Sequence, residues 1–506
     1  MAVQGYFRKK GWKRMGEFGE KRINTIVIDW KPDRDSEVPL YSQIVNYFSE
    51  KISSGSWLSG QTLPSQRKLS ELFKVNRSTI VEAMEELTSL GMLESGFGRG
   101  TKIANDSWSL LMQDKAPDWK SHIKAGGFRS NIPTVQIINQ LEFERGVTRM
   151  STGELSPELM QTELTREVLS KLSTRDLFMN YPDPLGMPGL RTAIQDYLRE
   201  NGIDVPLSNI LVVSGALQAL QLICMGIVQA KSAVYVESPS YLRSLNLVQS
   251  VGAEIKGVPM DDDGILPWMI REPQSSTCHS LLYTIPTFQN PTGCVMPESR
   301  RIEVLKCCRK NHMPIIEDDV FRDLWLDKVP PPTIKSMDQN GSVVYIGSLS
   351  KCFSPGLRLG WLVGPESVVQ RLADVKMQMD YGVSVLTQQV VEELLRSGLY
   401  YTGVNTIRQH LRERRDLILY LLEKYFGDLA EWDRPSGGFF IWVRLKHRMS
   451  AEHLFNRALK EGLLILPGSV YDMGYSSAFR LTYGYLSPKE LESGVKRLAE
   501  ILKSMS

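Results

Sequence analysis

The sequence predicts two domains of different fold class: a small winged helix-turn-helix and, after a linker, a larger α/β domain that ends in an α+β lobe. The chain has 506 residues, more than a usual single domain. Helical periodicity before residue 105 ends in a glycine-rich hairpin pattern. Beyond residue 146, short β-branched runs that are apolar on both faces alternate with helical patterns, which predicts a parallel sheet. A hydrophobic content of 42% is ordinary for a soluble globular protein, and a net charge of +3 does not by itself indicate a nucleic-acid binder.

Several function classes are disfavoured by what the sequence lacks. Its six cysteines form no CxxC pair and there is no HExxH, so we expect reduced thiols and no metal site. The most apolar stretch, 210–228, is interrupted by polar residues and does not read as a membrane span. The N-terminus is basic but has no apolar signal-peptide run. We therefore expect a cytoplasmic protein without a membrane partner.

Three helices are expected in the first domain. Apolar residues recur at helical spacing in the first of them, at Ile44, Val45, Phe48 and Ile52. The segment "LPSQRKLSELF" predicts a second, short helix that begins near Ser65. After the turn "KVN", the segment "RSTIVEAMEELTSLG" predicts a third helix, with Asn76 as its N-cap. The stripe of this third helix is Ile80, Met84, Leu87 and Leu90.

A glycine-tipped hairpin, "MLESGFGRGTKIA", follows these helices, and this order is that of a winged helix-turn-helix. A recognition helix reads the major groove with its first turn, which here holds Arg77, Ser78 and Thr79. Arg67, near the start of the preceding helix, can bind a backbone phosphate. Arg99 and Lys102 lie in the wing and can reach an adjacent groove.

The segments "PLYSQI", "SGSWLSGQTLPSQRKLSELFKVNRSTIVEAMEELTSLGMLES" and "GFGRGT" together resemble the GntR-type winged helix. The resemblance implies that the partner is double-stranded operator DNA. The positions that it implies as DNA contacts are Arg67, Arg77, Ser78, Thr79 and Gly98. Several relatives carry an arginine where this chain has Val81, so the base sequence that it reads stays open.

Domain boundaries follow from changes in pattern along the chain. Residues 1–24 form a basic arm that matches no known pattern, and the first domain spans 25–105. Residues 106–145 contain Pro and Gly without a clear period and are interpreted as a linker with partial helix. The second domain spans 146–506, with a large lobe over about 146–385 and a small lobe over about 386–506.

In the large lobe, four motifs suit one cofactor. A strand that ends at Gly215 and Ala216 passes into a helix, whose free N–H groups can bind phosphate. The strand "IIEDD" ends in carboxylates, one of which can keep a pyridine nitrogen protonated. "QNPTG" supplies an amide suited to a phenolate oxygen. Lys351 can form a Schiff base, and Ser348 and Arg358 offer a hydroxyl and a cation for phosphate.

In this order, "YPDPLGMPGLRTAI", "NPTG", "SKCFSPGLRLGW" and "LPGSVY" resemble the fold-type I pyridoxal-phosphate enzymes of the aminotransferase superfamily, from about residue 145 to the end. The resemblance implies the cofactor pyridoxal 5'-phosphate, with Lys351 as the residue that bonds to it. It also implies a set of cofactor contacts: Asp318 at the pyridine nitrogen, Asn290 at the ring hydroxyl, Tyr241 stacked on the ring, and Gly215, Ala216, Ser348 and Arg358 at the phosphate. Tyr181 would reach the phosphate from a neighbouring subunit, and Arg480 would bind a substrate carboxylate, with Arg243 as a second cation.

Two departures from the enzyme pattern bear on activity. Phe321 stands where many of these enzymes have a tyrosine that bonds the ring oxygen, and Ala216 replaces a hydroxyl residue in the phosphate turn. Losing the phenol removes an orienting contact and raises the effective pKa of the cofactor-bound lysine. We read this as a mild sign against efficient turnover.

A GntR-type reader ahead of an aminotransferase-like domain resembles the MocR/GabR group of bacterial transcription regulators, over about residues 25–506. This implies a regulator that senses pyridoxal phosphate or an amino compound, works as a homodimer, usually head-to-tail, and retains at most a transamination half-reaction. The alternatives are a genuine aminotransferase carrying an accessory DNA-binding domain and a cofactor-free repressor. The sequence does not disclose the effector, the operator or the sign of regulation.

Overall fold

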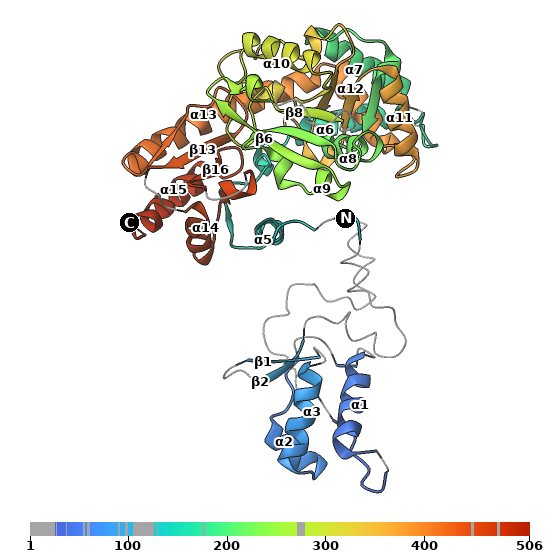
Figure 1. Cartoon of the computed structure of the whole chain (residues 1–506), viewed down its shortest axis with the longest axis vertical. Coiled ribbons are helices and arrows are strands. Elements are labelled where there is room, and N and C mark those ends of the chain that lie inside the picture. The colour runs from blue at the N-terminus through green and yellow to red at the C-terminus, as the bar shows by residue number, and fades with distance from the viewer. Residues whose placement is uncertain are drawn as a thin grey trace, which may run out of the picture. The chain divides into compact units, whose positions relative to one another are not determined.

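A computed structural model describes residues 26–505 apart from 27, 37, 54–55, 58–60, 90–91, 97–99, 105–125, 129, 176–177, 271–278, 447–449 and 473–475. The chain divides into two compact units, Met1–Gly126 and Gly127–Ser506, which are described separately (Figure 1). The expected basic arm, residues 1–24, lies outside the described residues.

The first unit contains three helices and a hairpin in the predicted order. Its elements are α1 (Leu40–Ser53), α2 (Gln66–Phe73), α3 (Arg77–Ser89), β1 (Leu93–Gly96) and β2 (Gly100–Ile103). Helix α2 begins where expected, because the side chain of Ser65 accepts a hydrogen bond from the N–H of Lys68 and so caps the first turn. The stripes of all three helices meet in one core, in which Phe48, Leu69 and Leu87 are fully buried. The winged helix-turn-helix fold is confirmed.

The second unit is built on an eight-stranded sheet with the order β4-β11-β10-β9-β8-β5-β6-β7. Its strands are β4 (Ile210–Val213), β5 (Ala233–Ser238), β6 (Glu254–Asp261), β7 (Gly264–Ile265), β8 (Ser280–Thr284), β9 (Ile315–Asp318), β10 (Val343–Ser348) and β11 (Gly360–Val363). Strands β4, β9, β10 and β11 are buried along their whole length, which explains their unbroken apolar sequences.

The sheet is mixed, which corrects the expectation of a parallel sheet. Strand β11 runs antiparallel to both β10 and β4, and β7 runs antiparallel to β6. A strand that is buried on both faces has the same apolar pattern in either direction, so its sequence does not reveal its direction. The remaining strands run parallel, and their carboxyl ends therefore lie at one edge of the sheet.

Helices cover this sheet and continue into the small lobe. The helices of the large lobe are α5 (Pro133–Leu141), α6 (Thr162–Leu172), α7 (Pro188–Glu200), α8 (Ala216–Gly226), α9 (Leu247–Ser250), α10 (Glu298–Lys310), α11 (Glu366–Met377) and α12 (Val385–Arg396). Helix α5 falls within the segment that the sequence predicted as a linker. No helix among the described residues is both long enough and apolar enough to span a bilayer.

The small lobe is an antiparallel sheet with three helices, and these elements gather at one side of the second unit (Figure 1). Its elements are α13 (Leu399–Phe426), β12 (Ala430–Trp432), β13 (Phe440–Leu445), α14 (Ala451–Lys460), β15 (Leu466–Pro467), β16 (Ala478–Thr482) and α15 (Pro488–Lys503). Two further short strands, β3 (Thr148–Arg149) and β14 (Leu463–Leu464), pair in parallel. Residues just after the expected linker are thereby anchored to the small lobe.

Candidate functional site

One pocket of about 390 Å³ lies at the edge where the parallel strands end. Strand β9 ends at Asp318, β10 ends at Ser348 just before Lys351, and β4 leads into the first turn of α8. The predicted residues that line this pocket are Ala216, Tyr241, Asn290, Asp318, Ser348, Lys351, Arg358 and Arg480. Motifs far apart in sequence therefore meet because parallel strands bring their carboxyl ends together. We call this the strand-end pocket.

The Arg358 guanidinium and the start of α8 form one end of the strand-end pocket, which Ser350 also lines. Gly215 has φ +86°, and a Cβ there would lie 3.2 Å from the Arg358 guanidinium, so only glycine fits. Arg358 donates to the carbonyl of Ser214 at 3.2 Å and lies next to the N-terminus of α8. Ser350 carries a buried hydroxyl with no hydrogen-bond partner among the described residues. This end therefore suits a phosphate.

Asp318 is a buried carboxylate with one oxygen satisfied and one free. The Tyr283 hydroxyl donates to its Oδ2 at 2.8 Å, whereas Oδ1 is buried and has no partner in the described part of the chain. Burial raises the pKa of Asp318 to about 6, although the Tyr283 hydrogen bond opposes the rise, as does the backbone N–H of Val320, which makes no hydrogen bond of normal geometry with the carboxylate. A buried, unpartnered carboxylate oxygen is unfavourable unless a donor arrives to meet it.

Lys351 carries the amine of the pocket. Its Nζ donates to the carbonyl of Gly153 at 2.7 Å. Burial lowers the pKa of Lys351 to about 8, and the positive charge of Arg480 acts in the same direction. A lysine with a lowered pKa presents more of the neutral, nucleophilic amine at neutral pH.

Arg480, from β16, forms the opposite end. Its Nη1 donates to Oδ1 of Asn290 at 2.8 Å, and its Nη2 donates to the carbonyl of Ser151. The guanidinium also lies 3.9 Å from the ring centre of Phe440 and is almost fully buried. Burial lowers the pKa of Arg480, but an arginine still keeps its charge. A fixed, desolvated cation of this kind suits a carboxylate.

Phe321 packs where the enzyme pattern has a tyrosine. Its ring contacts those of Phe439 and Phe440 edge-on, with centroids 5.6 and 5.7 Å away. The side chain lines the strand-end pocket and is 2% exposed. This wall of the pocket is therefore apolar and offers no phenolic donor.

Two predicted residues lie apart from the strand-end pocket. Tyr181 is 80% exposed and its ring lies 5.5 Å from that of Tyr381, which is also exposed. Arg243 is not among the residues that line the pocket, and its guanidinium lies beside Gly257. Within one chain, the structure thus brings neither residue to the other predicted groups.

The predicted DNA contacts are partly described. Arg77 and Ser78 are exposed in the first turn of α3, and Thr79 is half-buried. Arg67 is exposed on α2 and forms an ion pair with Glu71 at 3.2 Å. Lys102 is exposed on β2. Gly98 and Arg99, like Leu90, lie outside the described residues.

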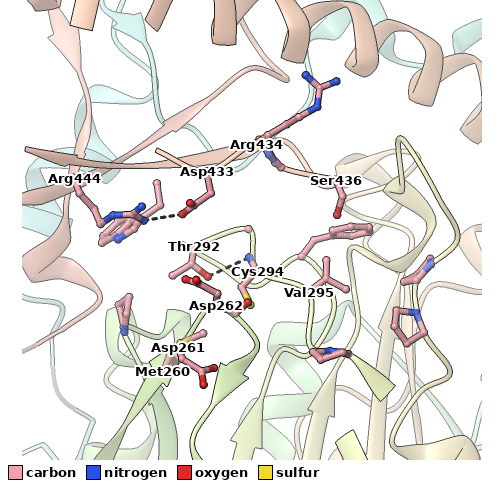
Figure 2. A pocket seen from close by; sticks show the side chains of 18 of the residues that line it. Met260, Asp261, Asp262, Thr292, Cys294, Val295, Asp433, Arg434, Ser436 and Arg444 are labelled. Carbon is pink, nitrogen blue, oxygen red and sulfur yellow. Dashed lines mark hydrogen bonds and ion pairs between the residues drawn. The ribbon is translucent and has the colours of Figure 1, made fainter. Parts of the chain in front are cut away.

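A second, larger cavity of about 880 Å³ lies between the β6–β7 turn, the loop 292–295 and the small lobe (Figure 2). Figure 2 shows Arg444 pointing toward Asp433, to which it donates at 2.8 Å. Cys294 donates to the carbonyl of Asp262 at 3.1 Å, and burial raises the pKa of its thiol to about 12. This cavity, which we call the outer cavity, contains none of the predicted site residues.

Sequence reasoning missed several groups at the strand-end pocket. Tyr283 lies inside β8, where its apolar neighbours indicate only core packing. Ser350 stands next to Lys351 in the sequence and could have been considered for that reason. Glu142 and Glu154 line the pocket from segments that carry no catalytic motif.

Two family models match the chain. Residues 40–103 match the bacterial regulatory proteins of the gntR family, and residues 140–498 match aminotransferase class I and II. The HTH-type transcriptional regulator YisV of Bacillus subtilis is 44% identical over 476 residues, which cover 94% of this chain and 98% of that protein. The HTH-type transcriptional regulator NorG of Staphylococcus aureus is 32% identical over 454 residues, which cover 88% of this chain and 100% of that protein.

Solved structures resemble the second unit. A kynurenine aminotransferase of Pyrococcus horikoshii in complex with PMP is 28% identical with a TM-score of 0.70, covering 74% of this chain and 95% of that one. A second structure is that of LysN, an α-aminoadipate aminotransferase of Thermus thermophilus, complexed with N-(5'-phosphopyridoxyl)-L-leucine. It is 27% identical with a TM-score of 0.68, and the match covers 77% of this chain and 99% of that one. The predicted fold of the second domain is confirmed.

Proposed function

The chain belongs to the family of HTH-type transcriptional regulators that carry a GntR domain ahead of an aminotransferase class I and II domain, and we propose that pyridoxal phosphate and an amino compound control its binding to DNA. Two separate chemistries support this proposal. The first unit exposes a recognition helix, and the second gathers an amine, a carboxylate and two arginines in one pocket.

The residues of the strand-end pocket fit pyridoxal phosphate. The free Oδ1 of Asp318 is an acceptor for a protonated ring nitrogen, and Arg358 with the start of α8 can bind the phosphate. Lys351 provides the amine that would hold the cofactor covalently. When bound, the cofactor supplies an electron sink and a carbonyl equivalent that reacts with amines.

The observation that carries the proposal is the buried, unpartnered Asp318 oxygen across the pocket from an amine of lowered pKa. A chain that used this domain only for dimerisation would gain stability by pairing or removing that oxygen. Its presence is the feature expected of a ligand site in which function outweighs stability.

We further propose a homodimer, arranged head-to-tail, as the element that transmits the signal. Tyr181 and Tyr381 form an exposed aromatic pair, which suits an interface with a second copy in which Tyr181 reaches the partner's phosphate site. An amino compound then changes DNA affinity only if it binds two arrangements of the dimer with different affinity.

The test compares Lys351→Ala with the control Lys310→Ala, an exposed lysine at the end of α10. Protein saturated with pyridoxal phosphate is freed of excess cofactor and its visible absorbance is recorded. Gel shifts with the adjoining intergenic DNA follow, with and without amino compounds. We expect Lys351→Ala to lose the covalent absorbance band and the response to ligand, and Lys310→Ala to keep both. Unchanged absorbance and regulation in Lys351→Ala would refute the proposal.

The DNA contact has its own test. Arg77→Ala should weaken operator binding by roughly 10-fold or more and reduce the dependence of binding on salt concentration, since one cationic contact is lost. Arg166→Ala, an exposed arginine on α6 paired with Glu163, is the control and should bind as the wild type does. Equal affinities and equal salt slopes would exclude Arg77 from the interface.

A genuine aminotransferase is the second candidate, because the strand-end pocket holds both the amine and the carboxylate that this chemistry uses. Phe321 argues against it, since no phenol faces the pocket at that position. Sustained turnover with a 2-oxo acid acceptor, at about 1 per second or faster, would favour the enzyme. A single half-reaction that then stops supports the regulator.

A further inference from the structure

Helix α5 forms one wall of the strand-end pocket. The residues of this segment that line the pocket are Asn131, Val135, Ile138, Asn139 and Glu142. Within α5, Ile138 and Asn139 follow Val135 by three and four residues and share one face with it, Glu142 continues this face as the C-cap, and Asn131 precedes the helix. Ile138 is buried in the core of the second unit and anchors that face. Glu142, at the C-terminal end of α5, is thus held against the pocket by packing.

Two carboxylates on the pocket wall lack a partner. Glu142 and Glu154 both line the pocket, and neither side chain makes a hydrogen bond or ion pair with any residue that the structure describes. Both charges nevertheless act on Lys351, and that of Glu142 also acts on Arg480. The carboxylates therefore lie near the groups that would hold a ligand.

The other charges of the strand-end pocket have assigned partners under the proposed function. Arg358 meets the phosphate, Asp318 the ring nitrogen, and Arg480 the carboxylate of an amino acid. Lys351 is taken up in holding the cofactor. Glu142 and Glu154 have no such assignment, and they line the same pocket as Lys351 and Arg480, so a ligand held by those two groups would meet their negative field. An anionic side chain would be repelled there, and a neutral one would leave both carboxylates unpaired.

We propose that Glu142 is a specificity-determining residue that selects an amino acid with a cationic side chain as the effector. This inference rests on the proposed function and names the class of its ligand. A terminal ammonium or guanidinium would bind at Glu142, while the α-carboxylate binds at Arg480. Glu154, which is more exposed, adds to the negative field at the same wall.

The experiment uses the full-length protein loaded with pyridoxal phosphate and three probes, L-ornithine, L-norleucine and L-glutamate. Dissociation constants come from calorimetry and from the change in visible absorbance. The variants are Glu142→Gln and the control Glu144→Gln, which removes an exposed carboxylate two residues away that does not line the pocket. A gel shift with each probe then reports whether binding reaches the DNA-reading unit.

The wild type should bind L-ornithine at least about fivefold more tightly than L-norleucine, and L-glutamate most weakly. Glu142→Gln should reduce the ornithine preference roughly two- to fivefold, the range of one partly screened charge pair, and leave L-norleucine within twofold. Glu144→Gln should match the wild type. Glu142→Asp should keep part of the preference, because the charge stays.

Three results would overturn the inference while leaving the proposed function intact. L-norleucine and L-ornithine could bind equally, Glu142→Gln could keep the full preference, or Glu142→Gln could tighten every probe equally. The last result would mean that Glu142 only competes with the ligand carboxylate for Arg480. If no probe changes the absorbance or the DNA complex, the inference about the ligand class also fails, whereas the proposed function fails only by the Lys351→Ala test.

Discussion

The outer cavity and the strand-end pocket, both in the second unit, differ in how completely their polar groups are paired. The outer cavity is larger, yet its Arg444 and Asp433 pair with each other, and its Asp261 pairs with Arg300. The described residues that line it include no buried side-chain oxygen or nitrogen without a partner. The strand-end pocket is less than half as large and holds two such atoms, on Asp318 and Ser350.

This comparison teaches that unmet hydrogen bonds identify a site better than volume does. A buried polar atom without a partner costs about 1–3 kcal/mol. Seven other described residues carry such an atom outside both pockets, so the atom indicates a ligand site only where it also lines a pocket, as on Asp318 and Ser350. A surface charge that is already paired with another residue of the protein gains little by binding a ligand. Four substitutions test this difference, ordered from the largest expected effect to the smallest.

Asp318→Asn should have opposite effects on binding and stability. It should weaken pyridoxal phosphate binding roughly 10- to 100-fold, because a charged hydrogen bond to the ring nitrogen is lost. The cofactor-free protein should become more stable by about 1–2 kcal/mol at pH 7, since a buried charge with a pKa of about 6 disappears. Fluorescence titration measures the first effect and urea unfolding the second. Weaker binding with no gain in stability would contradict the account of Asp318.

The sign of the pH dependence follows from the raised pKa of Asp318. The folded protein holds this proton more tightly than the unfolded chain, whose carboxyl titrates near 3.8. Relative to Asp318→Asn, the cofactor-free wild type should therefore lose stability as pH rises from about 4 to about 6, and the difference should then level off. Urea unfolding across this range measures it, and a difference that grows toward low pH would refute the assignment.

Tyr283→Phe should act on the same carboxylate through its other oxygen. The Tyr283 hydroxyl holds the pKa of Asp318 down, so its removal should raise that pKa further and weaken the cofactor about 3- to 10-fold at pH 7. The loss should shrink at higher pH, where the carboxylate ionises again. Cofactor titrations at several pH values provide the test. A loss that is independent of pH would mean that Tyr283 contributes only packing.

Phe321→Tyr should sharpen the view of this pocket as a sensor. A phenol at this position would donate to the ring oxygen of the cofactor. The pH at the midpoint of the change in the visible band of the loaded protein should then fall by about one unit. Transamination rates should rise in the same variant, and cofactor affinity should change less than it does in Asp318→Asn. A spectrophotometric pH titration measures the shift. An unchanged midpoint would show that the hydroxyl does not reach the cofactor.

Arg444→Ala in the outer cavity should have the smallest effect. Its pair with Asp433 is largely exposed, so the free energy of unfolding should fall by about 1 kcal/mol or less. Cofactor affinity and ligand response should remain within twofold of the wild type. A larger change in cofactor binding would break the comparison, because it would make the outer cavity part of the functional site.

The fold was largely predictable where local signals agree with tertiary packing. Ser65 caps α2 as its sequence context indicated, and the apolar residues of α1 form the core of the first unit. Strand β9 was recognisable because an apolar run ends in carboxylates. The direction of β11 was not, since a fully buried strand has the same pattern either way. Helix α5 was read as part of a linker because it is short and the surrounding residues 106–145 show no clear period.

By itself, the sequence predicted which side chains would meet at one pocket. Asp318 ends β9 and Lys351 follows β10, and parallel strands bring these ends together. Arg358 precedes β11, which reaches the same edge because it runs antiparallel to β10. Only the tertiary structure decided their surroundings. It placed Tyr283 on one oxygen of Asp318 and Glu142 on the pocket wall, because packing between distant segments sets burial, hydrogen bonds and charge balance. These quantities depend on three-dimensional neighbours, which a linear motif does not encode.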